Sequence, residues 1–156
     1  MRAPGGRVYL AGPLFTEGER AFNLVLARRI EKLGYRVFLP QRDVPPARGR
    51  GRTRRLYEGC LGGLRSADLV VAVCDGPMAD DGTAWECGYA AGTGKTVYAL
   101  RTDFRRVAAD EHVNLMIQEG VTKFFPTVPR LLGALQRARA KPGKGRRSRG
   151  RHLTRR

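Results

Sequence analysis

The sequence is poor in cysteine and histidine. Its 156 residues include three cysteines, Cys60, Cys74 and Cys87, and two histidines, His112 and His152. An odd number of cysteines without C-x-x-C spacing indicates reduced thiols, which favours a cytoplasmic protein. Because no Cys/His cluster is present, no metal site is expected.

Long apolar runs are also missing. No run approaches the ~20 residues that a membrane-spanning helix needs. The N-terminus lacks the apolar core of a secretory signal peptide. At 156 residues the chain is long enough to bury a core without disulfides, so we expect one cytoplasmic domain and no membrane contact.

Acidic residues are absent from two segments that hold much of the basic charge. The formal net charge is +16, but residues 141–156 carry eight Lys or Arg and residues 48–55 carry five Arg. The rest of the chain is nearly balanced, with 17 basic and 14 acidic residues. We therefore expect a folded domain over 1–140 and a disordered basic tail over 141–156.

The tail could contact RNA, DNA or another polyanion through phosphate groups. An arginine-rich extension that only keeps the protein soluble is the alternative. No aromatic residue interleaves the arginines of 141–156, so the tail itself does not suggest base stacking.

Apolar patterns in the sequence alternate between strand and helix. Strands are predicted at 7–11, 35–39, 68–73, 96–100 and 121–125, helices at 17–33, 54–66, 83–92, 111–118 and 127–139, and a mobile loop at 43–53. This order predicts an α/β fold with a doubly wound, five-stranded parallel sheet. In such folds ligands bind beyond the carboxyl ends of the strands, which selects residues 12–15, 40–43 and 74–86.

The stretch GYAAGTGKT at 88–96 resembles the phosphate-binding loop of an ATPase. The motif needs Gly five residues before Gly94, where Tyr89 stands, and it needs a strand before the loop and a helix after it. Here the order is helix, then strand. We therefore interpret Gly92 and Gly94 as a helix stop and a turn.

Carboxylates cluster directly after the strand predicted at 68–73. Asp75, Asp80, Asp81 and Glu86 lie there, and Glu86 stands on an otherwise apolar helix. Near a helix N-terminus Glu86 is expected to stay ionised and could act as a nucleophile or base. The pattern Thr83-x-x-Glu86 is also a capping box, and from these residues alone the cap is favoured. The three aspartates have an equally simple interpretation as turn residues.

Three segments together resemble the nucleoside 2-deoxyribosyltransferase family: Tyr9-x-Ala11-Gly12-Pro13-Leu14-Phe15, Asp80-x-Gly82-Thr83-x-x-Glu86-x-Gly88 and Asn114-Leu115-Met116. The resemblance covers about residues 7 to 135. It implies a flavodoxin-like sheet and an enzyme that moves 2'-deoxyribose from a nucleoside to a free base, as in base salvage. It implies a covalent glycosyl-enzyme and net retention of configuration at the anomeric carbon, as in retaining glycosidases. It also implies that no cofactor is needed.

The resemblance also assigns roles to single residues. Glu86 matches the nucleophile, Tyr9 the group that orients it, and Asp80 the carboxylate that engages the base and moves its proton. From the residues alone, Tyr9 is as well explained as a packed strand aromatic.

Pocket-forming roles fall on further positions. Gly12, Phe15 and Gly82 are expected to shape the sugar and base pocket, although Phe15 could also be a loop anchor, and Gln41 to read the base edge. The segment with Asn114 and Met116 is expected to reach a neighbouring subunit's site, which implies a homodimer or larger homo-oligomer.

One position departs from the family's pattern. Cys60 stands where the family often has an aspartate, and a thiol cannot replace a carboxylate as a hydrogen-bond acceptor. Glu58 lies on another helix face and does not substitute for it. The arginines of 48–55 could attract a 5'-phosphate, which suits the related nucleotide N-glycoside hydrolases. Transfer, hydrolysis, and a catalytically weak domain that binds nucleic acid through its tail therefore remain three hypotheses.

Overall fold

The computed structural model describes residues 5–140. The basic tail predicted over 141–156 lies outside the described residues, so the domain boundary and the tail's contact with a polyanion stay predictions. The described elements are, in chain order, β1 (Arg7–Ala11), α1 (Glu17–Lys32), β2 (Arg36–Phe38), α2 (Pro40–Asp43), α3 (Arg52–Ser66), β3 (Leu69–Val73), α4 (Asp81–Gly92), β4 (Thr96–Leu100), α5 (Leu115–Gly120), β5 (Lys123–Phe125) and α6 (Val128–Ala140). Among residues 5–140, no helix is both long and apolar enough to cross a lipid bilayer.

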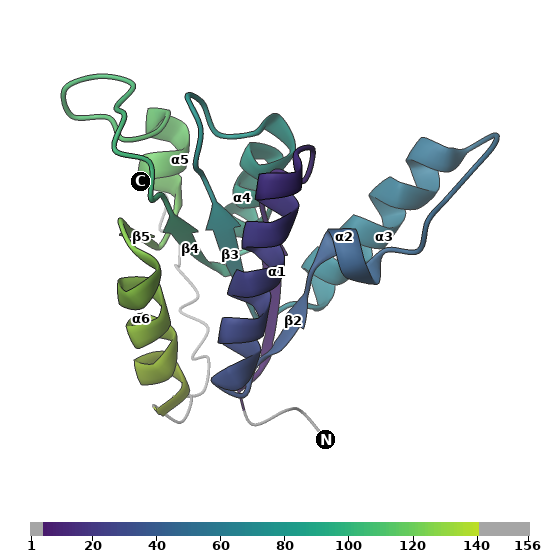
Figure 1. Cartoon of the computed structure of the whole chain (residues 1–156), viewed down its shortest axis with the longest axis horizontal. Helices are drawn as coiled ribbons and strands as arrows, with labels where there is room; N and C mark the ends of the chain where they lie inside the picture. The colour runs from purple at the N-terminus through teal and green to yellow at the C-terminus, as the bar shows by residue number, and fades with distance from the viewer. Residues whose placement is uncertain (1–4, 141–156) are drawn as a thin grey trace, which may run out of the picture.

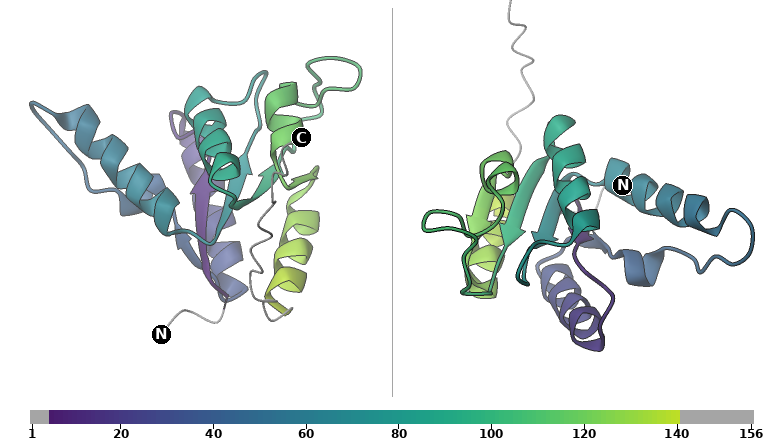
Figure 2. Two further views of the ribbon diagram at one scale, coloured as in Figure 1. Left: turned by 180° about the vertical axis from the view of Figure 1, so that it is seen from behind. Right: turned by 90° about the horizontal axis from the view of Figure 1, so that it is seen from above.

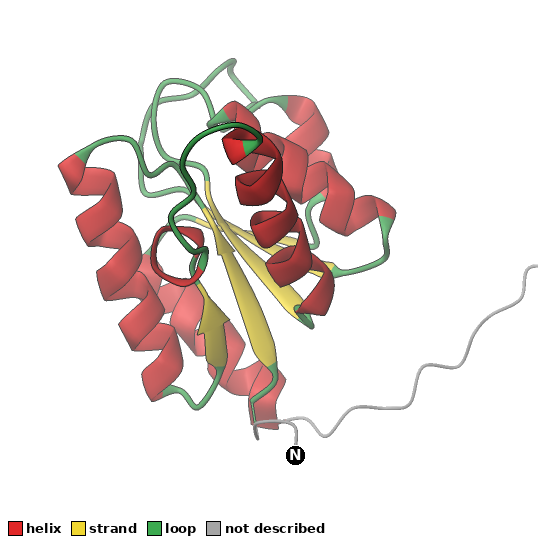
Figure 3. Cartoon of the chain, turned by 90° about the vertical axis from the view of Figure 1, so that its right-hand side faces the viewer, coloured by secondary structure: helices red, strands yellow, loops and turns green. Residues whose placement is uncertain are grey.

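The strands form one parallel sheet in the order β2-β1-β3-β4-β5 (Figure 1). Side chains alternate between its two faces, as the period of two in a strand requires. In β1, Val8 and Leu10 join the core beside α1 and α6, whereas Tyr9 and Ala11 join the core beside α3, α4 and α5. Helices therefore cover both faces (Figures 2 and 3). The predicted doubly wound, flavodoxin-like sheet is confirmed.

The order of the strands reverses between β1 and β3. From this point β1 is followed by β2 on one side, and β3 is followed by β4 and β5 on the other. Ligands of doubly wound sheets bind in the crevice outside such a switch point. Tyr9 is the central residue of β1, and α4 follows β3, so both flank this point. Figure 1 shows α3 and the segment before it projecting away from the sheet on the side of β2.

Most predicted boundaries agree with the structure within two residues, and two differ for physical reasons. The loop predicted at 43–53 is shorter, because Pro40–Asp43 form α2 and α3 already begins at Arg52. The helix predicted at 111–118 begins only at Leu115, because the Asn114 side chain caps it by accepting from the Met116 backbone N–H at 3.0 Å.

The turn interpretation of GYAAGTGKT is confirmed. Helix α4 ends at Gly92, Gly94 has φ 72°, and β4 begins at Thr96. The Lys95 ammonium donates to the Ala67 carbonyl at 2.7 Å and the Arg65 carbonyl at 3.0 Å, so it binds carbonyls at the end of α3.

Candidate active site

Tyr9 and Glu86 meet at the switch point of the sheet. The Tyr9 side chain is fully buried on the α3/α4 face, and its hydroxyl donates a hydrogen bond to Oε1 of Glu86. The Tyr9 ring stacks on Phe38 with centroids 5.6 Å apart, and Gly63 of α3 leaves the space that the Phe38 ring occupies. Strand β1 thus holds the hydroxyl rigidly against α4.

The Glu86 carboxyl is destabilised as an anion. Burial raises its pKa to about 7, the hydrogen bond from Tyr9 opposes this shift, and the charge of Asp80 adds to it. The expectation of a fully ionised group at the positive helix end was therefore wrong. Glu86 is the sixth residue of α4, beyond the first turn, where the helix dipole has little effect and burial dominates.

The predicted capping box at Thr83 was also wrong. Helix α4 begins two residues earlier than expected, and Asp80 is its N-cap. Oδ2 of Asp80 accepts from the Thr83 backbone N–H at 2.8 Å and from the Thr83 hydroxyl at 3.0 Å. The cap leaves Glu86 free of capping and turned toward Tyr9.

A cavity of about 340 Å³ opens beside Glu86, between α3 and α4. The size is within the range of small-molecule sites. Its lining is mostly apolar and consists of Tyr57, Cys60, Leu61, Leu64, Gly82, Trp85 and Glu86. Gly82 is thus the predicted pocket residue that joins Glu86 here, while Tyr9 and Asp80 act on Glu86 from outside the lining.

Cys60 lies in this cavity close to both Tyr9 and Glu86. Burial, with the nearby Glu86 charge, raises the pKa of its thiol, so the group is neutral at physiological pH. Glu58 instead forms an exposed ion pair with Arg54 at 2.7 Å, which agrees with the expectation that it does not replace the missing aspartate. The Glu86 cavity therefore contains one carboxyl group.

Three other predicted residues lie outside the Glu86 cavity, around the β1–α1 connection. Phe15 is 72% exposed. Gly12 leaves room for Asn23 and Val73, because an added Cβ would lie 3.2 Å from an atom of each. The Gln41 amide donates to the Arg20 carbonyl at 2.9 Å and accepts from Asn23 at 3.3 Å. Their roles toward a sugar or base stay predictions.

Asn114 and Met116 line a separate cavity of about 550 Å³ between α4 and α5. Met116 is 75% exposed, and Asn114 is exposed as the cap of α5. Neither residue joins the Glu86 cavity of the same chain. Their contribution to a neighbouring subunit stays a prediction.

Tyr57 and Trp85 are lining residues that sequence reasoning missed. Tyr57, Cys60, Leu61 and Leu64 recur at helical spacing on α3, and Trp85 directly precedes Glu86. That spacing is a usable signal for one helix face. It does not reveal that this face meets α4 across a cavity.

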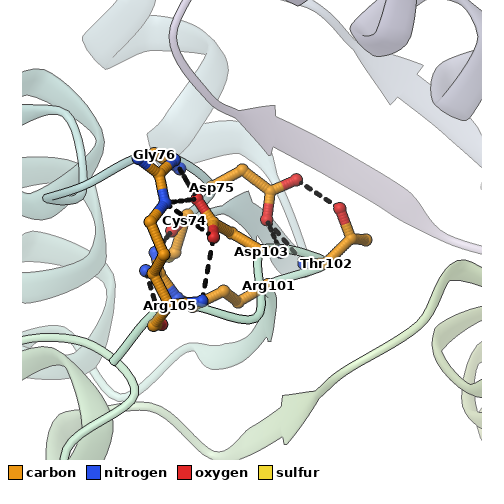
Figure 4. A network of polar contacts seen from close by, with 7 residues as sticks. All are labelled: Cys74, Asp75, Gly76, Arg101, Thr102, Asp103 and Arg105. Atoms are coloured by element: carbon orange, nitrogen blue, oxygen red, sulfur yellow. Dashed lines mark hydrogen bonds and ion pairs between the residues drawn. The ribbon is translucent and has the colours of Figure 1, made fainter. Parts of the chain in front are cut away.

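A second polar centre lies at the carboxyl ends of β3 and β4 (Figure 4). Asp75 accepts from the Thr102 hydroxyl at 2.7 Å and from the Thr102 and Asp103 backbone N–H groups. Asp103 accepts from the Gly76 N–H at 3.2 Å and pairs with Arg105. These residues line a cavity of about 730 Å³ on the α1 side of the sheet. Hydrogen-bond donors of the protein itself therefore satisfy the carboxylates of Asp75 and Asp103.

Metal ligands do not gather in the part of the chain that the structure describes. Within residues 5–140, no three His, Cys, Asp or Glu side chains lie close enough together to hold an ion.

Comparisons with known proteins identify the family of the chain. A family model described as nucleoside 2-deoxyribosyltransferase matches residues 8–136. No curated protein matches the chain. Similar solved structures include a conserved protein from Enterococcus faecalis V583, with a TM-score of 0.76, 26% identity, and coverage of 85% of this chain and 98% of that chain.

Two further structures have enzymatic names. The 2-deoxyribosyltransferase of Bacillus psychrosaccharolyticus gives a TM-score of 0.70 at 24% identity, over 83% of this chain and 95% of that chain. A CMP N-glycosidase of Clostridium botulinum gives 0.56 at 18% identity, over 83% and 97%. At these identities the likeness shows the fold, while the family model covers most of the sequence. The chain belongs to the nucleoside 2-deoxyribosyltransferase family.

Proposed function

We propose that this protein transfers 2'-deoxyribose between nucleobases, with Glu86 as the nucleophile. The observation that carries the proposal is the Tyr9–Glu86 hydrogen bond beside a cavity at the switch point, in a chain of this family. A buried carboxyl held by one fixed donor is positioned, as a nucleophile must be. Its partner Tyr9 is itself buried and stacked, so the carboxyl has a rigid support.

The reaction takes two displacements. A Glu86 carboxylate oxygen attacks C1' of a deoxynucleoside, and the N-glycosidic bond breaks with its electron pair passing to the base. The result is a deoxyribosyl ester on Glu86. A ring nitrogen of a second base then attacks C1' and gives up its proton to Asp80, while the C1'–O bond of the ester breaks with its electron pair returning to the carboxylate. The two inversions give net retention.

Two neighbours adjust this chemistry. The Tyr9 hydroxyl donates to the carboxyl and lowers its pKa, which opposes the effect of burial and favours the anion that attacks. Asp80, fixed as the N-cap of α4, is the proposed carrier of the proton that the leaving base takes up. Its charge raises the pKa of Glu86, so the two carboxyl groups are electrostatically linked.

The test is chromatography of the purified full chain with deoxyinosine, with and without adenine. Deoxyadenosine is expected only when adenine is present. Glu86→Gln keeps the size and the acceptor oxygen of the side chain but removes the nucleophile, so it is expected to form none. Glu58→Gln, a surface carboxyl on α3, is the matched control and should react as wild type. Equal turnover by wild type and Glu86→Gln would refute the proposal.

Hydrolysis of the same bond is the second candidate. The Glu86 cavity contains no further carboxylate or amide side chain to hold an incoming base, whereas water as an acceptor needs none. Release of hypoxanthine without deoxyadenosine would identify the hydrolase. If deoxyinosine is not cleaved, deoxycytidine and deoxynucleotides are the next substrates, because Arg54 lies beside Tyr57 of this cavity and could bind a 5'-phosphate.

A further inference from the structure

Basic side chains gather without acidic ones at the β5 edge of the sheet, opposite α3 (Figure 1). Residues 121–140, which contain β5 and α6, hold four Lys or Arg and no Asp or Glu. Three of these cations, Lys123 of β5 and Arg130 and Arg137 of α6, are exposed, and we call them the edge cations. None of them belongs to the ion pairs found within residues 5–140. Their charges are therefore available to an anionic ligand.

The edge cations face one another across β5 and α6. Lys123 and Phe125 point to the same side of β5, and the Lys123 ammonium lies 5.6 Å from the centre of the Phe125 ring. That ring belongs to the core beside α6, so Lys123 is directed toward this helix. Arg130 and Arg137 are seven residues apart and share one helix face. Between them Gly133 has no side chain, and the Arg137 guanidinium lies 3.4 Å from the place that its Cβ would take.

Two adjoining cavities run along this surface. One of about 300 Å³ is lined by all three edge cations, and one of about 490 Å³ is lined by Lys123 and Arg137. Neither lining includes an acidic residue. Both cavities follow α6, whose 13 residues extend over about 20 Å. That length exceeds one phosphate group, so it suits successive phosphates of a polymer.

We propose that the edge cations bind the phosphate backbone of nucleic acid. Cations fixed along a groove neutralise neighbouring phosphates and release the counterions that surround them. Residues 121–140 expose no large apolar side chain on which a base could stack. The contacts therefore hold the backbone and do not read the bases. This surface uses no part of the Glu86 cavity and does not depend on the proposed transferase activity.

Two other occupants fit this surface less well. Binding to an anionic bilayer usually inserts apolar side chains, and residues 121–140 expose no large one. Two copies that met through the same surface would bring their edge cations together, which is repulsive. Charge complementarity thus favours a polyanion.

The position of this surface in the chain also favours a polyanion. Residues 141–156, which carry eight further Lys or Arg, follow α6 directly in the sequence. The sequence predicts contact with phosphate groups for them as well. The edge cations would add contacts whose positions are fixed by the fold.

The test measures the salt dependence of binding by the full chain. Fluorescence anisotropy follows a labelled DNA duplex of about 20 base pairs, which at ~3.4 Å per pair is longer than α6. The edge variant carries Lys123→Gln, Arg130→Gln and Arg137→Gln. It should bind at least about tenfold more weakly near physiological salt, and the slope of log K against log salt should fall by about three, one for each lost phosphate contact.

The matched control removes the same charge from the opposite edge of the sheet. It carries Arg48→Gln, Arg50→Gln and Arg52→Gln, three exposed residues before and at the start of α3. Its salt slope should equal that of wild type. Urea unfolding checks that both variants are folded. If the edge variant is not, Arg137→Gln alone is used, and its slope should fall by about one.

Four results would overturn the proposal. Equal loss of slope in both triple variants would assign binding to overall charge. Displacement of the duplex by inorganic phosphate at the same concentration of phosphate groups would identify a site for a single phosphate. Binding to vesicles of equal parts phosphatidylserine and phosphatidylcholine that is lost in the edge variant, with DNA binding kept, would identify a lipid surface. A lower sedimentation coefficient of the edge variant without DNA would identify a second copy as the occupant.

Discussion

Two carboxylate centres lie at the same end of the sheet, and they differ in how their charge is satisfied. Asp75 and Asp103 accept several hydrogen bonds, and Arg105 holds the pKa of Asp103 well below its usual range (Figure 4). Glu86 is buried with one hydroxyl donor, and its pKa rises to about 7. The larger cavity borders the first centre and the smaller cavity borders the second. Cavity size alone would select the first centre, whereas the buried carboxyl with a raised pKa supports the proposal that Glu86 is the reactive group.

Substitutions at the two centres should differ most in their effect on enzymatic activity. Glu86→Gln is expected to lower kcat/KM for deoxynucleoside cleavage about 1000-fold, equivalent to about 4 kcal/mol of transition-state stabilisation, because no covalent intermediate can form. Asp75→Asn should stay within a few fold of wild type. Steady-state chromatography of base release measures both. If Asp75→Asn lost as much activity as Glu86→Gln, the first centre would not be merely structural.

The buried Glu86 carboxyl should also make the stability of the protein depend on pH. The folded pKa of Glu86 lies above its ordinary value, so between about pH 4.5 and 7 the folded state keeps a proton that the unfolded state releases. The free energy of unfolding of wild type should therefore fall as the pH rises across this window. Glu86→Gln removes this contribution, which is on the order of 3 kcal/mol for a shift of this size. Urea unfolding at pH 5 and pH 8 measures it, and parallel profiles for the two proteins would contradict it.

The first centre should matter for stability. Asp75→Asn keeps the size of the side chain but weakens acceptance from the Thr102 hydroxyl and from two backbone N–H groups. We expect the free energy of unfolding to fall by about 2 kcal/mol at pH 7. Urea denaturation followed by circular dichroism measures the loss. Asp81→Asn is the control and should change stability little, because the Asp81 side chain is exposed and accepts from the adjacent Gly82 N–H.

Removing the hydroxyl of Tyr9 should give the smallest effect. Tyr9→Phe takes away the donor that lowers the pKa of Glu86, so the rise of kcat/KM with pH, expected near pH 7 in wild type, should move to higher pH. Activity at neutral pH should drop about tenfold, as for loss of one hydrogen bond to a charged group. Tyr35→Phe is the control, because that hydroxyl donates to the Leu135 carbonyl on the other face of the sheet. An unchanged pH midpoint in Tyr9→Phe would show that the bond does not tune Glu86.

The sheet could be predicted from the sequence because the evidence for it is local. Unbroken apolar runs such as Leu69–Val73, punctuated by Gly and Pro, specify buried parallel strands, and the sheet order follows from alternation with helices. The site depended on a finer detail. Asp80 and Thr83 can both cap a helix, and a shift of the cap by three residues moves Glu86 from the first turn to the second. The sequence alone does not decide which of these two residues caps α4, so the ionisation of Glu86 was predicted wrongly.

The cavity could not be predicted, because it depends on how α3 and α4 lie relative to each other. Tyr57 and Trp85 become neighbours only in the folded chain. Phe15 and Met116 show the opposite case, in which motif residues remain exposed within residues 5–140. A sequence motif gives the residue type but not the surface that it faces.

The Tyr9–Glu86 contact joins residues 77 positions apart. It can form only after β1 has paired with β3 and α4 has packed on the sheet. During synthesis, the Glu86 carboxyl is thus without its support until more than half of the chain has been made and has folded. The proposed nucleophile is therefore oriented in the same step that forms the native core, and a truncated or misfolded product should lack this orientation.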